Sequence, residues 1–205
     1  MTTSIFLGYD PGGRDCNGVA AVQIAASGSI ERLKTEIVRD ASEALEWLSQ
    51  FNDAEYLGID TLLAWSRTGG RDCDDRLRSK YKGRGGGSSV IPQNSLYSAM
   101  TINGVMVAME MKEAKSSLVL CESHPKLQVS ANLLPPDVVK LHATLAVDGN
   151  DHCSDALIAA WCASRWHYRA WAFDLYTSES NLVFPVGHAV FPWPEAVQGT
   201  GELSP

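Results

Sequence analysis

The sequence predicts an α/β domain with a mixed five-stranded sheet, made of a three-stranded antiparallel meander plus parallel strands and flanked by helices. Two observations predict this class. Three short apolar runs separated by turn residues fill the first 38 positions. Helical patterns then alternate with further short apolar runs, which is typical of parallel strands. The length of 205 residues suits a single domain spanning 1–205.

The meander comes first in the chain. Residues 4–9 (SIFLGY) and 18–25 (GVAAVQIA) are apolar and are separated by a glycine-rich link, which predicts a hairpin. The run at 30–38 (IERLKTEIV) alternates loosely and follows the turn residues Ser27 and Gly28. We therefore expect three consecutive antiparallel strands.

Helices and parallel strands follow the meander. Apolar residues at helical spacing, with Asp40 or Ser42 as the cap, predict a helix over 40–51. Further strands are expected at 56–60 and 117–122, and further helices at 95–114, 136–147 and 151–169. The segment 64–94 is rich in Gly, Arg and Ser with little periodicity, so we expect an elaborated basic loop there. The prolines after 171 indicate a short C-terminal extension over 171–205, a minor edge addition.

Composition limits the classes of function. A hydrophobic fraction of 45% and a charged fraction of 20% are typical of a globular protein. The net charge of −7 argues against a general nucleic-acid coat protein, although the segment 67–84 carries seven cations against three acids. No apolar run is long enough for a membrane span, and no signal peptide is recognisable. The five scattered cysteines favour reduced thiols, so we expect a cytoplasmic protein without a membrane partner.

Carboxylates end several of the expected elements. Asp10, Asp60 and Glu122 each close a strand, while Asp155 lies in the first turns of the last helix with Asp151 one turn earlier on the same face. The carboxyl ends of parallel strands meet at one edge, where neighbouring acids repel one another. Mg²⁺ or Mn²⁺ would remove that repulsion and suits oxygen ligands. Taken singly, an acid at a strand end is more often a turn or helix cap than a ligand, and Asp151 sits where an N-cap belongs, so the metal site is predicted from the acids together.

Several short motifs occur in a recognisable order. GYDPGG with GVA is followed by LGIDTLLAW, GGRDCDDRLR, PQNSL, CESHPK and HCSDALIAAW. Over about residues 5–170 this series resembles the domain of unknown function 429 family, regarded as predicted nucleases of the ribonuclease H-like superfamily. The resemblance implies a ribonuclease H-like fold. The chain departs from the family pattern at Thr61 and Leu62, where many members have Ala-Pro.

The resemblance also implies roles for the acids. It matches Asp10 with the first-strand aspartate that ligates both metals, Asp60 with the acid ending the fourth strand, and Asp155 with the acid of the last helix. Glu122, which precedes His124, matches a Glu-x-x-Pro-like feature of the family.

The basic loop and the histidines are candidates for contacts with substrate. Because the loop begins directly after the strand of Asp60, its arginines could hold phosphates at the mouth of the site. The alternative is a solvated loop in which Asp72, Asp74 and Asp75 pair with neighbouring arginines. His124 and His152 adjoin candidate acids and could move protons, or be structural. The candidate substrate-binding residues are Arg67, Arg71, Arg76, Arg78 and His124.

These features favour a metal-dependent nuclease or phosphodiesterase that hydrolyses phosphodiester bonds of nucleic acid, RNA or DNA, with acid-bound Mg²⁺ or Mn²⁺. The candidate catalytic residues are Asp10, Asp60, Glu122 and Asp155, and the candidate metal ligands are Asp10, Asp60, Asp151 and Asp155. Two alternatives stay open. One is a nucleotide-binding phosphotransfer domain of actin or sugar-kinase type, with Asp10 beside Mg·ATP. The other is a non-catalytic ribonuclease H-like binding domain.

Overall fold

The computed structural model describes residues 4–67, 69–84, 89–90, 98–146 and 151–197. The expected helix start at 95–97, the PQNSL motif at 92–96 and part of the glycine-rich stretch lie outside these residues. Among the described helices, none combines the length and the apolar character needed to cross a membrane.

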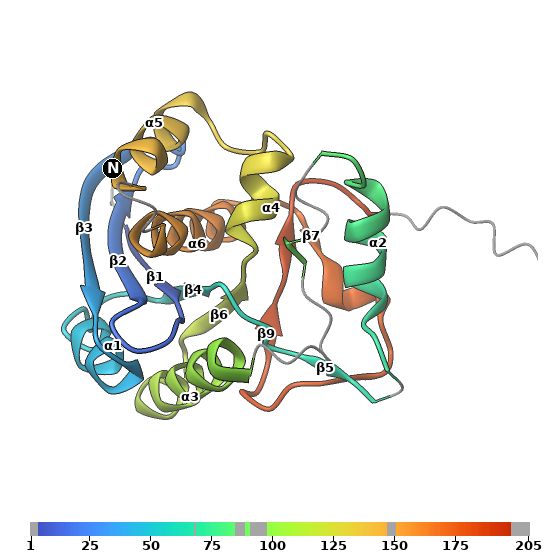
Figure 1. Ribbon diagram of the computed structural model, residues 1–205, viewed down its shortest axis with the longest axis horizontal. Coiled ribbons are helices and arrows are strands. Elements are labelled where there is room, and N and C mark those ends of the chain that lie inside the picture. Colours follow the sequence, from blue (N-terminus) through green and yellow to red (C-terminus); the bar gives the residue numbers. More distant parts are fainter. Residues whose placement is uncertain (1–3, 68, 85–88, 91–97, 147–150, 198–205) are drawn as a thin grey trace, which may run out of the picture.

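A mixed sheet of six strands forms the centre of the fold (Figure 1). Its order is β3 (Ile30–Val38), β2 (Asn17–Ile24), β1 (Ser4–Asp10), β4 (Tyr56–Ile59), β6 (Val119–Glu122) and β9 (Ala189–Val190). The first three strands are antiparallel, and β4, β6 and β9 continue the sheet in parallel. The meander and the parallel strands are confirmed. The expectation of five strands is wrong by one, because the two-residue β9 is too short to leave a hydrophobic pattern.

Helices cover both faces of the sheet (Figure 1). One face carries α1 (Ala41–Leu48) and α3 (Ser98–Ala114), and the other carries α4 (Pro125–Ser130), α5 (Pro136–Leu145) and α6 (His152–His167). Alternation along β1 divides the core between them, since Leu7 belongs to the cluster under α1 and α3, and Phe6 to the cluster under α6. Asp40 caps α1 by accepting hydrogen bonds from the amides of Ser42 and Glu43.

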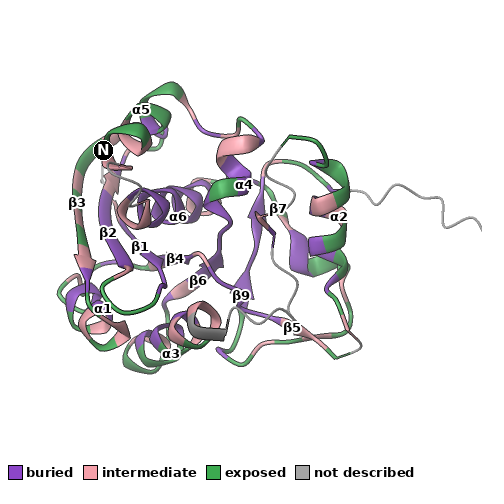
Figure 2. Ribbon diagram, in the orientation of Figure 1, coloured by how far each residue is buried: buried purple, intermediate pink, exposed green. Residues whose placement is uncertain are grey.

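Helix α6 lies unusually close to the sheet. A Cβ atom on Gly8 of β1 would fall 1.9 Å from the carbonyl oxygen of Ala156, and one on Gly58 of β4 would fall 1.9 Å from that of Ala159. The two glycines are register partners in adjacent strands. Glycine is therefore needed at both positions for the helix backbone to rest on the sheet. Figure 2 shows α6 almost wholly buried, with the exposed edge strand β3 beyond it.

The segment 64–94 is more regular than its sequence indicates. It contains β5 (Trp65–Ser66) and α2 (Asp72–Lys80). Cys73, Leu77 and Tyr81 are buried at a spacing of four residues, so a single apolar stripe fixes an otherwise polar helix. The expectation of little periodic structure in this segment is wrong for its described part.

The C-terminal extension contributes to the core. It contains β7 (Phe173–Asp174), η2 (Leu175–Ser178), β8 (Leu182–Val183) and β10 (Pro192–Trp193), besides β9. Strand β8 pairs with β5, and β10 pairs with β7. Tyr176, Phe191 and Trp193 are buried within the main hydrophobic cluster. The extension is therefore more than the minor edge addition that its prolines suggested.

Candidate metal centre

Three of the predicted acids gather on the α6 face of the sheet. Asp10 is the last residue of β1, and the amide of Asp60 donates to the carbonyl of Tyr9 at 3.0 Å, which continues the ladder between β1 and β4 past the end of β4. Asp155 lies in the first turn of α6, the helix that rests on Gly8 and Gly58. The parallel strands and the close helix thus bring the three carboxylates to one edge.

The electrostatics of these acids are unfavourable without a cation. Asp10 is 3% exposed, and desolvation raises its pKa to about 6, with a further contribution from the charge of Asp155. His152 opposes this shift through its Nδ1 atom, which lies 2.6 Å from Asp10 Oδ2. Desolvation, followed by the charges of Asp10 and Asp155, raises the pKa of Asp60 well above its usual range. Excess negative charge is therefore concentrated here.

Asp155 offers a buried oxygen with no hydrogen-bond partner among the described residues. The residue is 2% exposed, and its Oδ1 atom is 3.8 Å from His142 Nε2, beyond hydrogen-bonding distance. Burying an unpartnered carboxylate oxygen is unfavourable. Three carboxylates with one such oxygen fit the all-oxygen ligand preference of Mg²⁺ or Mn²⁺.

Asp151 and Lys126 lie at the exposed side of this group. Asp151 occupies the N-cap position of α6, but its side chain makes no capping hydrogen bond. Lys126 Nζ is instead 3.2 Å from Asp151 Oδ2 and 3.9 Å from Asp155 Oδ2. Lys126 is not among the residues that the sequence predicts for the site, although the CESHPK motif contains it. A cation one residue after the proline that opens a helix was the available signal.

Glu122 lies on the other face of the sheet. Tyr9, Ile59 and Glu122 are aligned across β1, β4 and β6, so the position aligned with Asp10 and Asp60 is Ser123. Because side chains alternate between faces, a one-residue offset sends Glu122 away from the aspartates. The structure thus brings together Asp10, Asp60 and Asp155, and separates Glu122 from them.

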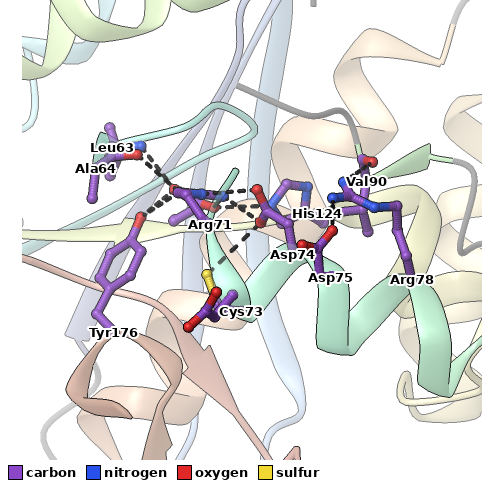
Figure 3. A network of polar contacts seen from close by, with 12 residues as sticks. Leu63, Ala64, Arg71, Cys73, Asp74, Asp75, Arg78, Val90, His124 and Tyr176 are labelled. Carbon is purple, nitrogen blue, oxygen red and sulfur yellow. Dashed lines mark hydrogen bonds and ion pairs between the residues drawn. The ribbon is translucent and has the colours of Figure 1, made fainter. Parts of the chain in front are cut away.

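On that face Glu122 belongs to a buried charged network, and Figure 3 labels its partners Arg71, Asp74, His124 and Tyr176. Arg71 Nη2 lies 2.6 Å from Glu122 Oε1 and 2.6 Å from Asp74 Oδ1. His124 Nε2 is 2.9 Å from Glu122 Oε1, and Tyr176 donates its hydroxyl to the same carboxylate. Burial acts to raise the pKa of Glu122, but the charge and hydrogen bonds of Arg71 and His124 lower it to about 2. Desolvation nevertheless raises the pKa of Asp74, so within this network Arg71 compensates Glu122 more fully than Asp74.

The same network contains a group with metal-ligating side chains. Among the described residues, Asp74, Glu122 and His124 form the one group of three whose ligand atoms all lie within 4.8 Å of one another. The three aspartates are spaced more widely. The guanidinium of Arg71 already contacts both carboxylates of this group at hydrogen-bonding distance. The network therefore already contains its own cation, the guanidinium of Arg71.

The predicted substrate-binding arginines do not gather around the aspartates. Arg71 is fully buried, which is not the placement of a phosphate-binding side chain. Arg76 donates to Ser178 Oγ at 2.5 Å, and Arg78 pairs with Asp75. Arg67 is exposed beside β5. The pairing of Arg78 with Asp75 agrees with the alternative of a solvated loop whose charges pair with one another. The fifth candidate, His124, belongs to the buried network of Glu122.

The β1–β2 loop is organised around the buried side chain of Asn17. Asn17 Oδ1 accepts from the hydroxyl of Tyr9 at 2.9 Å and from the amide of Gly12 at 3.1 Å, while its Nδ2 donates to Gly13 at 2.8 Å. The amides of Asp15 and Cys16 donate to other carbonyls. A loop that wraps nucleotide phosphates needs free amides. The amides of Gly12, Asp15 and Cys16 are therefore engaged, whereas those of Gly13 and Arg14 have no hydrogen-bond acceptor among the described residues, so the phosphotransfer alternative stays open.

Comparison of the chain with protein-family models, curated proteins and solved structures finds no match in any of the three. Membership of the domain of unknown function 429 family stays a prediction.

Proposed function

We propose that this chain is a metal-dependent phosphodiester hydrolase acting on nucleic acid, built on a ribonuclease H-like fold. The observation that carries the proposal is the convergence of Asp10, Asp60 and Asp155. The pKa values of Asp10 and Asp60 are raised, and a buried oxygen of Asp155 has no hydrogen-bond partner in the described part of the chain. The sheet order, a meander followed by parallel strands, supports the ribonuclease H-like assignment.

Each residue of the site has a definite task in this proposal. Asp10, Asp60 and Asp155 would hold Mg²⁺ or Mn²⁺, which when bound activates water and stabilises charge on phosphate oxygens. His152 holds the Oδ2 atom of Asp10 at 2.6 Å and so fixes the orientation of that carboxylate. Asn17 fixes the loop that follows Asp10. Rigid placement of this kind is what phosphoryl chemistry requires of a protein.

A cleavage assay tests the proposal. Labelled single-stranded RNA, single-stranded DNA and an RNA–DNA hybrid are incubated with the protein in Mn²⁺, Mg²⁺ or EDTA. We expect cleavage of at least one substrate in metal and none in EDTA. Asp10→Asn and Asp155→Asn should each lower the rate by roughly a hundredfold or more, because each removes a metal ligand.

The exposed Asp53 provides the matched control, since Asp53→Asn makes the same chemical change away from the site. Its rate should equal that of the wild type. Cleavage that persists in EDTA or in Asp10→Asn would point to a contaminating nuclease. Absence of cleavage of all three substrates would contradict the proposal and favour a non-catalytic binding domain.

A further inference from the structure

The aspartates create a difficulty for any nucleic-acid substrate. One divalent cation would offset only two of the four negative charges of Asp10, Asp60, Asp151 and Asp155, and the remainder would repel a phosphodiester backbone unless further positive charge stands beside them. The arginines of α2 do not supply it, because Arg71 is buried and α2 packs against η2 on the far side of β9 (Figure 1). The cations that face the aspartates come from other elements.

Three side chains that can carry positive charge contact the aspartates. His152 reaches Asp10, His142 reaches Asp155, and Lys126 reaches both Asp151 and Asp155. Their side chains are exposed to different degrees, 26% for His152, 23% for His142 and 60% for Lys126. An approaching phosphate would meet the lysine ammonium first.

Lys126 is mounted on a rigid support. The preceding Glu122 and His124 are held in the buried network of Arg71, and the amide of Ser123 donates to Ile59 at 2.9 Å. Pro125 opens α4 and fixes its own backbone angle, so the chain direction at Lys126 is set. The network on one face of the sheet thus fixes the origin of a long side chain that reaches the site on the other.

We propose that Lys126 binds a phosphate of the nucleic-acid backbone beside the aspartates, and that the buried network of Glu122 positions it. This inference rests on the proposed function and names its substrate contact. Lys126 is the phosphate-binding group, whereas Glu122 and Arg71 act only through it. Lysine is suited to this task because its ammonium is a compact charge on a flexible stem that can move from a carboxylate to a phosphate.

The test is the salt dependence of oligonucleotide binding. A labelled 12-nucleotide single strand is titrated across a series of NaCl concentrations in the presence of Ca²⁺, which takes the same kind of oxygen ligands as Mg²⁺. Lys126→Gln should weaken binding by about fivefold at low salt and reduce the slope of log K against log[salt] by about 0.7, the value for one lost phosphate contact on a single strand. Lys126→Arg should restore most of both.

Lys140→Gln is the matched control. Lys140 is exposed on α5, two residues from His142 and so on another side of the helix. The same charge is removed, but binding should change less than twofold and the slope should stay constant. A comparable effect of both variants would show a general charge effect and overturn the inference.

A second measurement separates binding from charge neutralisation. If Lys126 only offsets the charge of the aspartates, Lys126→Gln leaves oligonucleotide affinity and slope unchanged while Mn²⁺ affinity rises, and this result overturns the inference. A wild type that cleaves, combined with an unchanged slope in Lys126→Gln, refutes the inference and leaves the proposed function standing. Loss of slope in Lys126→Gln without any cleavage by the wild type supports the contact and refutes only the hydrolase.

Discussion

Glu122 and the three aspartates lie on opposite faces of the sheet and have opposite electrostatics. Asp10, Asp60 and Asp155 have more negative than positive charge around them, and the pKa values of Asp10 and Asp60 are raised. Glu122 is as deeply buried, yet Arg71 holds its pKa at about 2. Matched buried charges are typical of a structural network, and unmatched ones of a ligand site. A strand-end acid is therefore interpreted by the charges around it and not by its position alone.

The largest loss of stability is expected from removing Arg71 from its buried network with Glu122 and Asp74. Arg71→Met would leave Glu122 and Asp74 buried without their cation, so the free energy of unfolding should fall by about 3–5 kcal/mol. Urea denaturation measures it. Arg76→Met on the same helix, where the side chain is partly exposed, should change stability by about 0.5 kcal/mol at most. Equal effects of the two variants would mean that the network is not a unit.

The next largest effect concerns the packing that assembles the aspartates. Gly58→Ala places a Cβ atom 1.9 Å from the Ala159 carbonyl, and only movement of the α6 backbone can relieve it. We expect a loss of about 3 kcal/mol in the free energy of unfolding and weaker Mn²⁺ affinity. Gly13→Ala, where a Cβ atom meets nothing within 4 Å, should alter neither quantity. Full metal affinity in Gly58→Ala would show that the close packing of α6 on the sheet is not needed for the metal site.

A smaller change in the free energy of unfolding, of opposite sign, is expected from removing a charge among Asp10, Asp60 and Asp155. In EDTA at neutral pH, Asp60→Asn removes a charge that desolvation and two neighbouring acids disfavour, so the free energy of unfolding should rise by about 1 kcal/mol. Glu122→Gln should lower it, because Arg71 then loses its buried partner. Chemical denaturation of both variants checks the contrast. A destabilised Asp60→Asn would show that this acid is already compensated.

The smallest effect is a difference in pH dependence. The folded-state pKa of Asp10, about 6, exceeds its usual 3.8, so its contribution to stability is present below about pH 4 and is lost as the pH rises through about 6. His152, whose pKa is also raised, acts in the same direction. Glu122 has a depressed pKa, and its contribution is present above about pH 4.5 and lost as the pH falls towards 2.

Denaturation in EDTA from about pH 3 to pH 7 should therefore show two trends. The stability of the wild type relative to Asp10→Asn should fall as the pH rises. Its stability relative to Glu122→Gln should rise up to about pH 4.5 and then stay level. Parallel trends for the two variants would contradict the contrast between the faces.

Much of the fold and three of the acids could be predicted from the sequence. Short apolar runs mark β1, β2, β4 and β6, and a loose alternation of apolar and polar residues marks β3. The acids that follow the apolar runs of β1 and β4 can be recognised directly in the sequence. The face of the sheet on which Glu122 lies could not be predicted from the sequence. It depends on the register between parallel strands, which the local sequence pattern does not encode. The burial of Arg71 is also unreadable, since its partners Glu122 and Tyr176 lie 51 and 105 residues away. Strand β9 is too short for any pattern.

Calorimetric titration with Mn²⁺ tests most directly whether Asp10, Asp60 and Asp155 form a cation site. Wild type, Asp155→Asn and Asp53→Asn are compared at neutral pH. We predict saturable binding by the wild type and by Asp53→Asn. Affinity should fall by roughly tenfold or more for Asp155→Asn, which replaces the carboxylate whose buried Oδ1 atom has no hydrogen-bond partner among the described residues. Equal affinities in all three proteins, or no binding by the wild type, would contradict the metal centre.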